Sequence, residues 1–202
     1  EGDNGGYLGH PYKHSFRYSF QYGDHVKVAL IGAQDAGEPF LSNNNKWGYD
    51  YYSLFLHLRK WGCVKSLVFG QYRLNIGMGL VMNNHFGLGK TTILTTLGQS
   101  TNQIHPHASR TESNYLQGIA TTIQLSPHID ATAFVSLRPI DATLNADSSS
   151  VASIVKTGYH RTLAEMSKKH NTTEWLMGSN VNYRRKRFHW VLTGVWNKFD
   201  RA

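Results

Sequence analysis

Residues 15–22 read SFRYSFQY and alternate strictly between two kinds of side chain. Successive side chains of a β-strand point to opposite faces, so a period of two indicates a strand. The segment therefore predicts one strand with an aromatic face and a polar face. Its aromatic face holds Phe16, Tyr18, Phe20 and Tyr22, and its polar face holds Ser15, Arg17, Ser19 and Gln21.

Seven further segments follow the same period, and most of the eight have 8 to 13 residues. Strands of soluble proteins average about 5–6 residues, whereas strands that cross a membrane need about 9–11. The pattern predicts an all-β fold, an antiparallel meander of about eight long strands. The seven ranges are 25–34, 50–60, 64–76, 114–125, 129–138, 173–183 and 188–197.

Short and long connections alternate along this meander. Short turns are expected at Gly23-Asp24, Trp61-Gly62, 126–128 and 184–187, and long loops at 35–48, 77–112 and 139–172. In an antiparallel meander all short turns then lie at one end, which is the layout of outer-membrane β-barrels. We expect residues 1–13 to be a loop or linker and 14–202 to be a barrel, or a sector of a larger one. A soluble barrel or sandwich remains an alternative.

The two faces of the strands receive different assignments in such a barrel. Apolar positions would face lipid, and polar positions would line a wet lumen. We expect Phe16, Tyr18, Phe20, Tyr22, Leu54, Leu56, Leu58, Tyr72, Leu74, Trp190, Leu192 and Trp196 to face lipid. We expect Arg17, Gln21, Lys27, Arg59, Gln71, Arg73, Asn75 and Arg138 to line the lumen.

The composition excludes several classes of protein. Only 17% of the 202 residues are charged while 12% are aromatic, which argues against a disordered chain and against a coiled coil. A single cysteine, Cys63, excludes an internal disulfide and a cysteine-rich zinc module. No apolar stretch approaches the roughly 20 residues of a membrane helix.

The net charge of +8 permits nucleic acid, lipopolysaccharide phosphates or anionic substrates as partners. Residues 86–92, FGLGKTT, superficially resemble a phosphate-binding loop, but Asn84 stands where that motif needs its first glycine. An unspecific anion contact stays open at the most basic positions. These are Lys90, Arg184, Arg185, Lys186 and Arg187.

The sequence offers no metal or catalytic set. The pairs His10/His14 and His105/His107 lack neighbouring ligands at zinc spacing. Asp35 and Glu38 share a Gly/Pro turn, where carboxylates usually cap backbone N–H groups. We expect no catalytic residue, no bound metal and no cofactor. One short helix is expected in the third long loop, where residues 162–165, TLAE, fit a capping box.

Five segments together resemble the β-rich region of Bacteroidetes proteins described as helix-hairpin-helix domain-containing. They are 17–20 (RYSF), 35–40 (DAGEPF), 70–80 (GQYRLNIGMGL), 86–90 (FGLGK) and 160–165 (HRTLAE). The resemblance covers roughly 14–200 and implies an extended β region that looks like an outer-membrane barrel. The helix-hairpin-helix module itself is absent from the 202 residues, so its suspected DNA contact does not carry over. Leu163 replaces the proline usual after His-Arg-Thr, and the barrel is expected to continue beyond residue 202.

These observations lead to one expected function and two alternatives. We expect a non-enzymatic barrel in the bacterial outer membrane, acting in transport or in a membrane assembly. Its partners would be the lipid bilayer with lipopolysaccharide and other outer-membrane proteins. The first alternative is a soluble basic β-protein that binds nucleic acid through interleaved aromatic and basic residues at 16–22 and 184–190. The second is an outer-membrane enzyme with a site near Asp35 and Glu38.

Overall fold

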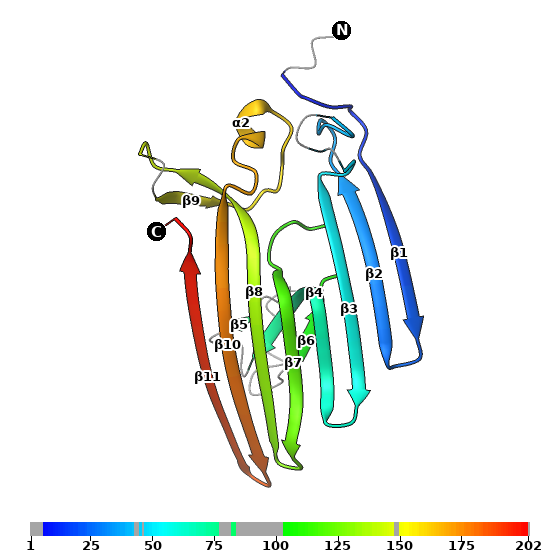
Figure 1. The fold of residues 1–202 in the computed structure, drawn as a ribbon, viewed down its shortest axis with the longest axis vertical. Coiled ribbons are helices and arrows are strands. Elements are labelled where there is room, and N and C mark those ends of the chain that lie inside the picture. The colour runs from blue at the N-terminus through cyan, green and yellow to red at the C-terminus, as the bar shows by residue number, and fades with distance from the viewer. Residues whose placement is uncertain are drawn as a thin grey trace.

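The computed structural model describes residues 6–42, 45, 47–76, 82–83, 103–147 and 150–201. It is all-β, as the sequence predicts, and eight strands follow one another in chain order through an antiparallel sheet (Figure 1). They are β1 (His14–Tyr22), β2 (Val26–Gln34), β3 (Tyr51–Trp61), β4 (Val64–Ile76), β7 (Leu116–Ser126), β8 (Ile129–Leu144), β10 (Thr172–Arg185) and β11 (Phe188–Phe199).

Short elements accompany the eight strands. β5 (Met82–Asn83) and β6 (Gln103–Pro106) pair with β4, and β9 (Val151–Val155) pairs with β8. The helix α2 (Leu163–Met166) begins at the N-cap Thr162 with the capping box that the sequence predicts. Among the described residues, no helix has the length and apolar character needed to span a membrane.

The alternation of short and long connections is confirmed. Four tight turns lie at one end of the sheet, and the β2–β3 loop and the segment with β9 and α2 lie at the other (Figure 1). We call these the turn end and the loop end. β8 is longer than expected, ending at Leu144 rather than at residue 138, because its last residues pair with β9.

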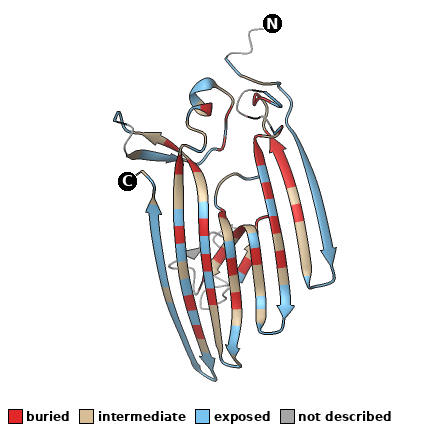
Figure 2. Ribbon diagram, viewed as in Figure 1, coloured by how far each residue is buried: buried red, intermediate tan, exposed pale blue. Residues whose placement is uncertain are grey.

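The sheet is open in the part of the chain that the structure describes. β1 pairs only with β2 and β11 pairs only with β10. Both edge strands are exposed along nearly their whole length (Figure 2). The predicted barrel is therefore seen as a curved, unclosed sheet.

The fourth strand leaves the sheet halfway along its length. β4 pairs with β3 only as far as Phe55↔Gly70, and its later residues pair with β6 and β5 instead. This second half crosses one side of the sheet, which we call the inner face, and the opposite side is the outer face. In the view of Figure 1, β5 and β6 lie behind the main strands.

The path of β4 corrects the sequence-based assignment of residues 71–76. Tyr72 and Leu74 do not face lipid, because both are fully buried in the core. Arg73 and Asn75 lie on the crossing segment, where they pair with β6, whereas Gln71 still pairs with Gln117 of β7. The prediction was wrong because it extended one period of two through Gly70, whose φ of +102° interrupts the regular strand.

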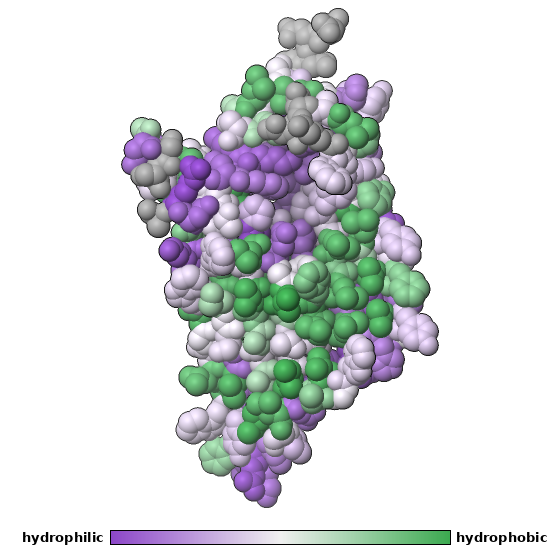
Figure 3. Space-filling view, in the orientation of Figure 1, coloured by the Kyte–Doolittle hydropathy of each residue, from purple (hydrophilic) through white to green (hydrophobic). Residues whose placement is uncertain are grey.

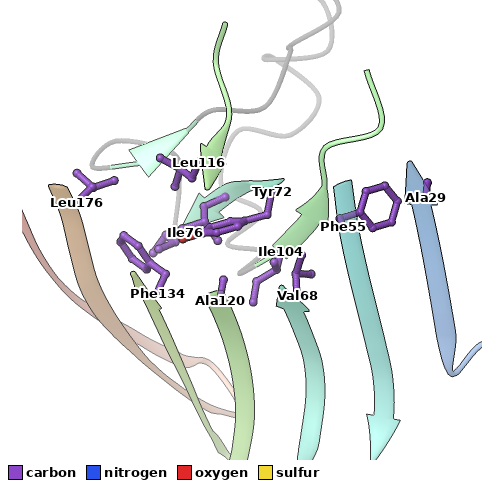
Figure 4. Packing of buried hydrophobic residues seen from close by; sticks show 11 residues of the cluster. Ala29, Phe55, Val68, Tyr72, Ile76, Ile104, Leu116, Ala120, Phe134 and Leu176 are labelled. Carbon is purple, nitrogen blue, oxygen red and sulfur yellow. The ribbon is translucent and has the colours of Figure 1, made fainter. Parts of the chain in front are cut away.

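The core lies between this crossing segment and the inner face (Figure 4). The hydroxyl of Tyr72 donates to the carbonyl of Val135 at 2.8 Å, which ties the segment to β8. The cluster combines crossing residues with inward side chains of six strands. It comprises Ala29, Phe55, Val68, Tyr72, Leu74, Ile76, Ile104, Leu116, Ala120, Phe134 and Leu176.

Substitution of Gly70 tests this bend. A Cβ at Gly70 would lie 2.2 Å from the carbonyl oxygen of Leu54, and the positive φ adds strain for any L side chain. We expect Gly70→Ala to lower the free energy of unfolding by about 2–4 kcal/mol. Gly194→Ala is the matched control, because a Cβ there meets nothing within 4 Å. Equal unfolding free energies for the two variants in denaturant titrations would contradict the bend.

Candidate functional site

The register of the sheet places apolar side chains on the outer face of every strand. Directly paired residues share a face, so Tyr18, Leu30 and Leu54 align across β1–β3. The same rule aligns Val135, Met177 and Trp196 across β8–β11. The large exposed hydrophobic residues of this face are Phe16, Tyr18, Phe20, Tyr22, Tyr52, Leu54, Phe69, Ile119, Leu125, Val135, Leu137, Trp175, Met177, Val181, Phe188, Trp190, Leu192 and Trp196.

Charged side chains are confined to the ends of this face. Within the eight described strands, Arg185 and Lys198 are the charged residues whose pairing places them outward, and both lie near strand ends. Figure 3 shows the consequence, an apolar band across the middle of the outer face between hydrophilic ends.

Aromatic residues bracket the apolar band along individual strands. On β10, Trp175 and Tyr183 flank Met177 and Val181 on the same face, and on β3 Tyr52 precedes three outward leucines. Trp175 and Tyr183 are eight residues apart, which corresponds to about 26 Å along the strand.

The inner face carries basic side chains around two adjoining cavities near the turn end. A cavity of about 310 Å³ is lined by Gln21, Asp24, Lys27, His57, Arg59 and His105, among others. A cavity of about 490 Å³ shares His57, Arg59 and His105 and adds Lys65, Asp130 and Arg184.

Apart from the three on β4 described above, the predicted lumen-lining residues fall into three groups. Gln21, Lys27 and Arg59 line these cavities. Arg17 lies on the inner side of edge strand β1, opposite Ile31. Arg138 lies deeper inside at the loop end, where it donates to the carbonyl of Tyr115 at 2.6 Å and stacks over that ring.

The predicted anion contacts are not gathered in one place. Arg184 lines the larger cavity, whereas its neighbour Arg185 points to the outer face. Lys186 and Arg187 form the exposed β10–β11 turn. Lys90 and the loop 86–92 lie outside the described residues.

A buried ionic cluster joins the loops at the loop end. Asp50, just before β3, accepts from His160 Nδ1 at 2.5 Å and from Lys169 Nζ at 2.7 Å. Asp141 of β8 accepts from His160 Nε2 at 2.9 Å. These bonds connect the β2–β3 loop, the segment around α2 and the end of β8.

Glu38 completes the cluster. Its two carboxylate oxygens accept from the backbone N–H groups of Asp35 at 2.7 Å and His160 at 3.0 Å, and the side chain is fully buried. Glu38 thus caps its turn, as expected for this motif, while Asp35 forms an ion pair with Lys13. Because both carboxylate oxygens are bound by backbone N–H groups and the side chain is buried, the arrangement gives no support to an enzymatic site here.

Both ring nitrogens of His160 donate to carboxylates, so the imidazole is a cation. Burial lowers the pKa of His160, but its hydrogen bonds to Asp141 and Asp50 outweigh this effect and raise it to about 10. Glu38, Asp50 and His160 bring one ligand atom each within 4.8 Å of one another. A metal would need a free imidazole lone pair, however, and Lys169 already occupies Asp50. The group therefore fits an ion-pair network and not a metal centre.

Glu112 lies beside this network and forms no ion pair with any of the residues that the structure describes. Burial, together with the negative charges of Asp50 and Glu38, raises the pKa of Glu112 to about 9. Glu112 is therefore protonated at neutral pH. It lines a small cavity of about 50 Å³ with Tyr51, Arg138 and Asp141.

The two histidine pairs singled out in the sequence do not form ligand sets. His105 lines the inner cavities, whereas His107 is buried, stacks on Tyr115 and contacts the carbonyl of Thr111. His14 packs against the rings of Phe40 and Tyr49.

Sequence reasoning missed the ionic cluster because its members are far apart in the chain. His160 and Asp50 are separated by 110 residues. The available signal was that the segments 35–40 and 160–165 both belong to the family resemblance. The structure brings them into contact through Glu38 and His160, and Gly37 and Arg161 line the same small pocket.

The chain matches no family model, and comparisons with curated proteins and with solved structures likewise find no match. Functional reasoning therefore depends on the residues and geometry described above.

Removal of the His160 cation tests the ionic cluster. His160→Gln leaves Asp50 and Asp141 buried with one cation fewer, and breaking a buried ion pair costs about 3–5 kcal/mol. We expect a loss of that order in the unfolding free energy at pH 7. His128→Gln, in the exposed β7–β8 turn, is the control and should change it by less than about 0.5 kcal/mol. If both variants changed the unfolding free energy by a similar, small amount, the cluster would not stabilise the contacts between the loops.

Glu112 provides a test through pH. A carboxyl whose folded pKa lies above its unfolded value opposes folding increasingly as pH rises from the unfolded pKa to the folded one. For Glu112 this window runs from about 4.5 to about 9. We expect Glu112→Gln to be more stable than the wild type at pH 8, by on the order of 5 kcal/mol, and equally stable at pH 4. A stability difference that does not change with pH would contradict the shift.

Proposed function

We propose that the protein is a β-barrel protein of the bacterial outer membrane, or a sector of such a barrel, whose outer face contacts lipid. The observation that carries the proposal is the outer face itself, which is apolar across all eight strands and charged only near strand ends. A soluble monomer rarely exposes a contiguous apolar patch larger than about a few hundred Å². Figure 3 shows an apolar band that crosses the width of the sheet.

The distribution of side chains along the strands supports the same proposal. Outer-membrane barrels carry an apolar band about 25 Å tall between aromatic girdles, with a polar interior. The outward residues of β10 follow this order from Trp175 to Tyr183, and its inward residues include the buried Asn180 and Asn182. The polar inner face, with its basic cavities, is then the lumen side. We propose a role in the passage of anionic solutes or in a membrane assembly.

The nucleic-acid alternative requires aromatic and basic side chains on one surface. Base stacking and phosphate contacts are made together along a bound strand. On β1 the outward Phe16, Tyr18 and Phe20 lie on the opposite face from Arg17. This separation favours the membrane proposal.

Two adjacent aliphatic residues of β11 provide the test. Leu192 points outward and is 75% exposed, whereas Val191 points inward and is 38% exposed. In a bilayer, arginine on the lipid face costs about 2–4 kcal/mol near the midplane, while lumen positions tolerate it. We expect Leu192→Arg to reduce folding into lipid vesicles and Val191→Arg to have little effect.

The folded fraction in vesicles is read from the heat-dependent shift in gel migration, after extraction with detergent. In a soluble protein Leu192→Arg would fold as well as Val191→Arg or better, because an exposed leucine accepts a charge without cost. Solubility without detergent, with neither variant affected, would overturn the proposal.

A further inference from the structure

We propose that the two adjoining inner cavities form one binding site for a phosphate-type anion, with Lys27 and Arg59 as its principal contacts. The cavities share His57, Arg59 and His105, so these side chains stand between the two spaces. They come from the second half of β6 and the turn end of β3, and Lys27 at the start of β2 lines the smaller cavity. The sequence predicts Lys27 and Arg59 as lumen-lining residues, but it does not show that they lie beside His57 and His105.

The charges around the cavities do not balance. The carboxylates on their walls are Asp24 and Asp130. Asp24 is bound by Lys60 at 2.8 Å, and Asp130 is bound by Lys65 at 2.7 Å. Both carboxylates are therefore neutralised by lysines other than Lys27.

Lys27 and Arg59 form no ion pair with any residue that the structure describes. Residues 77–81 and 84–102, which the structure does not describe, contain no Asp or Glu and so supply no carboxylate either. Two cationic side chains thus face the same space without a counterion from these parts of the protein. The unbalanced charge favours an anion with two negative charges.

The side chains present suit an oxyanion. A guanidinium group donates in a planar fork that matches phosphate oxygens, and an ammonium group supplies a point charge. Neutral donors stand nearby in Gln21 and Gln103, and the His57 ring contacts Ser66 Oγ at 2.9 Å. Together these groups offer both charge and hydrogen bonds to a phosphate.

The position of the site identifies the source of the phosphate. Lys27 pairs with His57 on the inner face, whereas the apolar residues lie on the outer face. A lipid headgroup approaches from the outer face, so the ligand is a soluble phosphate or phosphate ester. The site requires only the folded sheet, and its role in solute passage rests on the proposed function.

Titration calorimetry with inorganic phosphate, at low salt and with the protein folded in detergent, tests the site. We expect saturable binding by the wild type and at least about tenfold weaker binding by Lys27→Gln/Arg59→Gln. Arg185→Gln/Lys198→Gln is the matched control, because it also removes two positive charges but from the outer face. It should bind phosphate like the wild type.

Several outcomes would overturn the site. The first is that the wild type does not bind phosphate, and the second is that Lys27→Gln/Arg59→Gln binds it as the wild type does. The third is that both double variants bind phosphate equally weakly, which would mean that binding depends only on the net charge of the protein. If the cavity variant fails to fold, as judged by circular dichroism, Lys27→Gln alone should still weaken binding several-fold. In bilayer discs, phosphate binding that disappears when phosphatidylglycerol replaces phosphatidylcholine would assign the site to a lipid headgroup and overturn the soluble ligand. A failure here leaves the arginine test at Leu192 and Val191 unaffected.

Discussion

The contact of Tyr72 with β7 and β8 organises the interior, because it fixes the second half of β4 across the inner face. Its hydroxyl reaches the carbonyl of Val135, and the apolar residues that follow it enter the core. Tyr72, Leu74 and Ile76 of the crossing segment pack against the inward side chains of the sheet. The segment lies between the ionic cluster at the loop end and the basic cavities at the turn end.

This arrangement assigns different tasks to the two faces of the sheet. The inner face holds nearly all the polar chemistry: the His160 network that joins the loops, the protonated Glu112, and Lys27 and Arg59, which form no ion pair with a described residue. The outer face holds apolar and aromatic side chains in register from β1 to β11. Net positive charge in a chain of low charge content is therefore concentrated on one side, and the proposal of a membrane barrel follows from that separation.

Much of the fold could be predicted from local pattern alone. The period of two located the eight strands to within a few residues except at the end of β8, and the T-x-x-E segment located α2, because both signals depend on neighbouring residues. The bend at Gly70 could not be predicted, since it depends on where β5 and β6 find space. The ionic cluster was equally inaccessible, because Asp50, Asp141 and His160 become neighbours only after the sheet forms. The pairing of Lys27 with His57 likewise emerges from register between strands.

The central claim is that the two faces of the strands meet different solvents. Spin labels at successive positions of 188–199, attached to single cysteines in a Cys63→Ser background and reconstituted in bilayers, measure this directly. The account predicts that collisions with oxygen, which concentrates in lipid, peak at outward positions such as 190 and 192. Collisions with a water-soluble nickel complex should peak at the inward positions between them. Equal access of the nickel complex to both sets of positions would contradict the account.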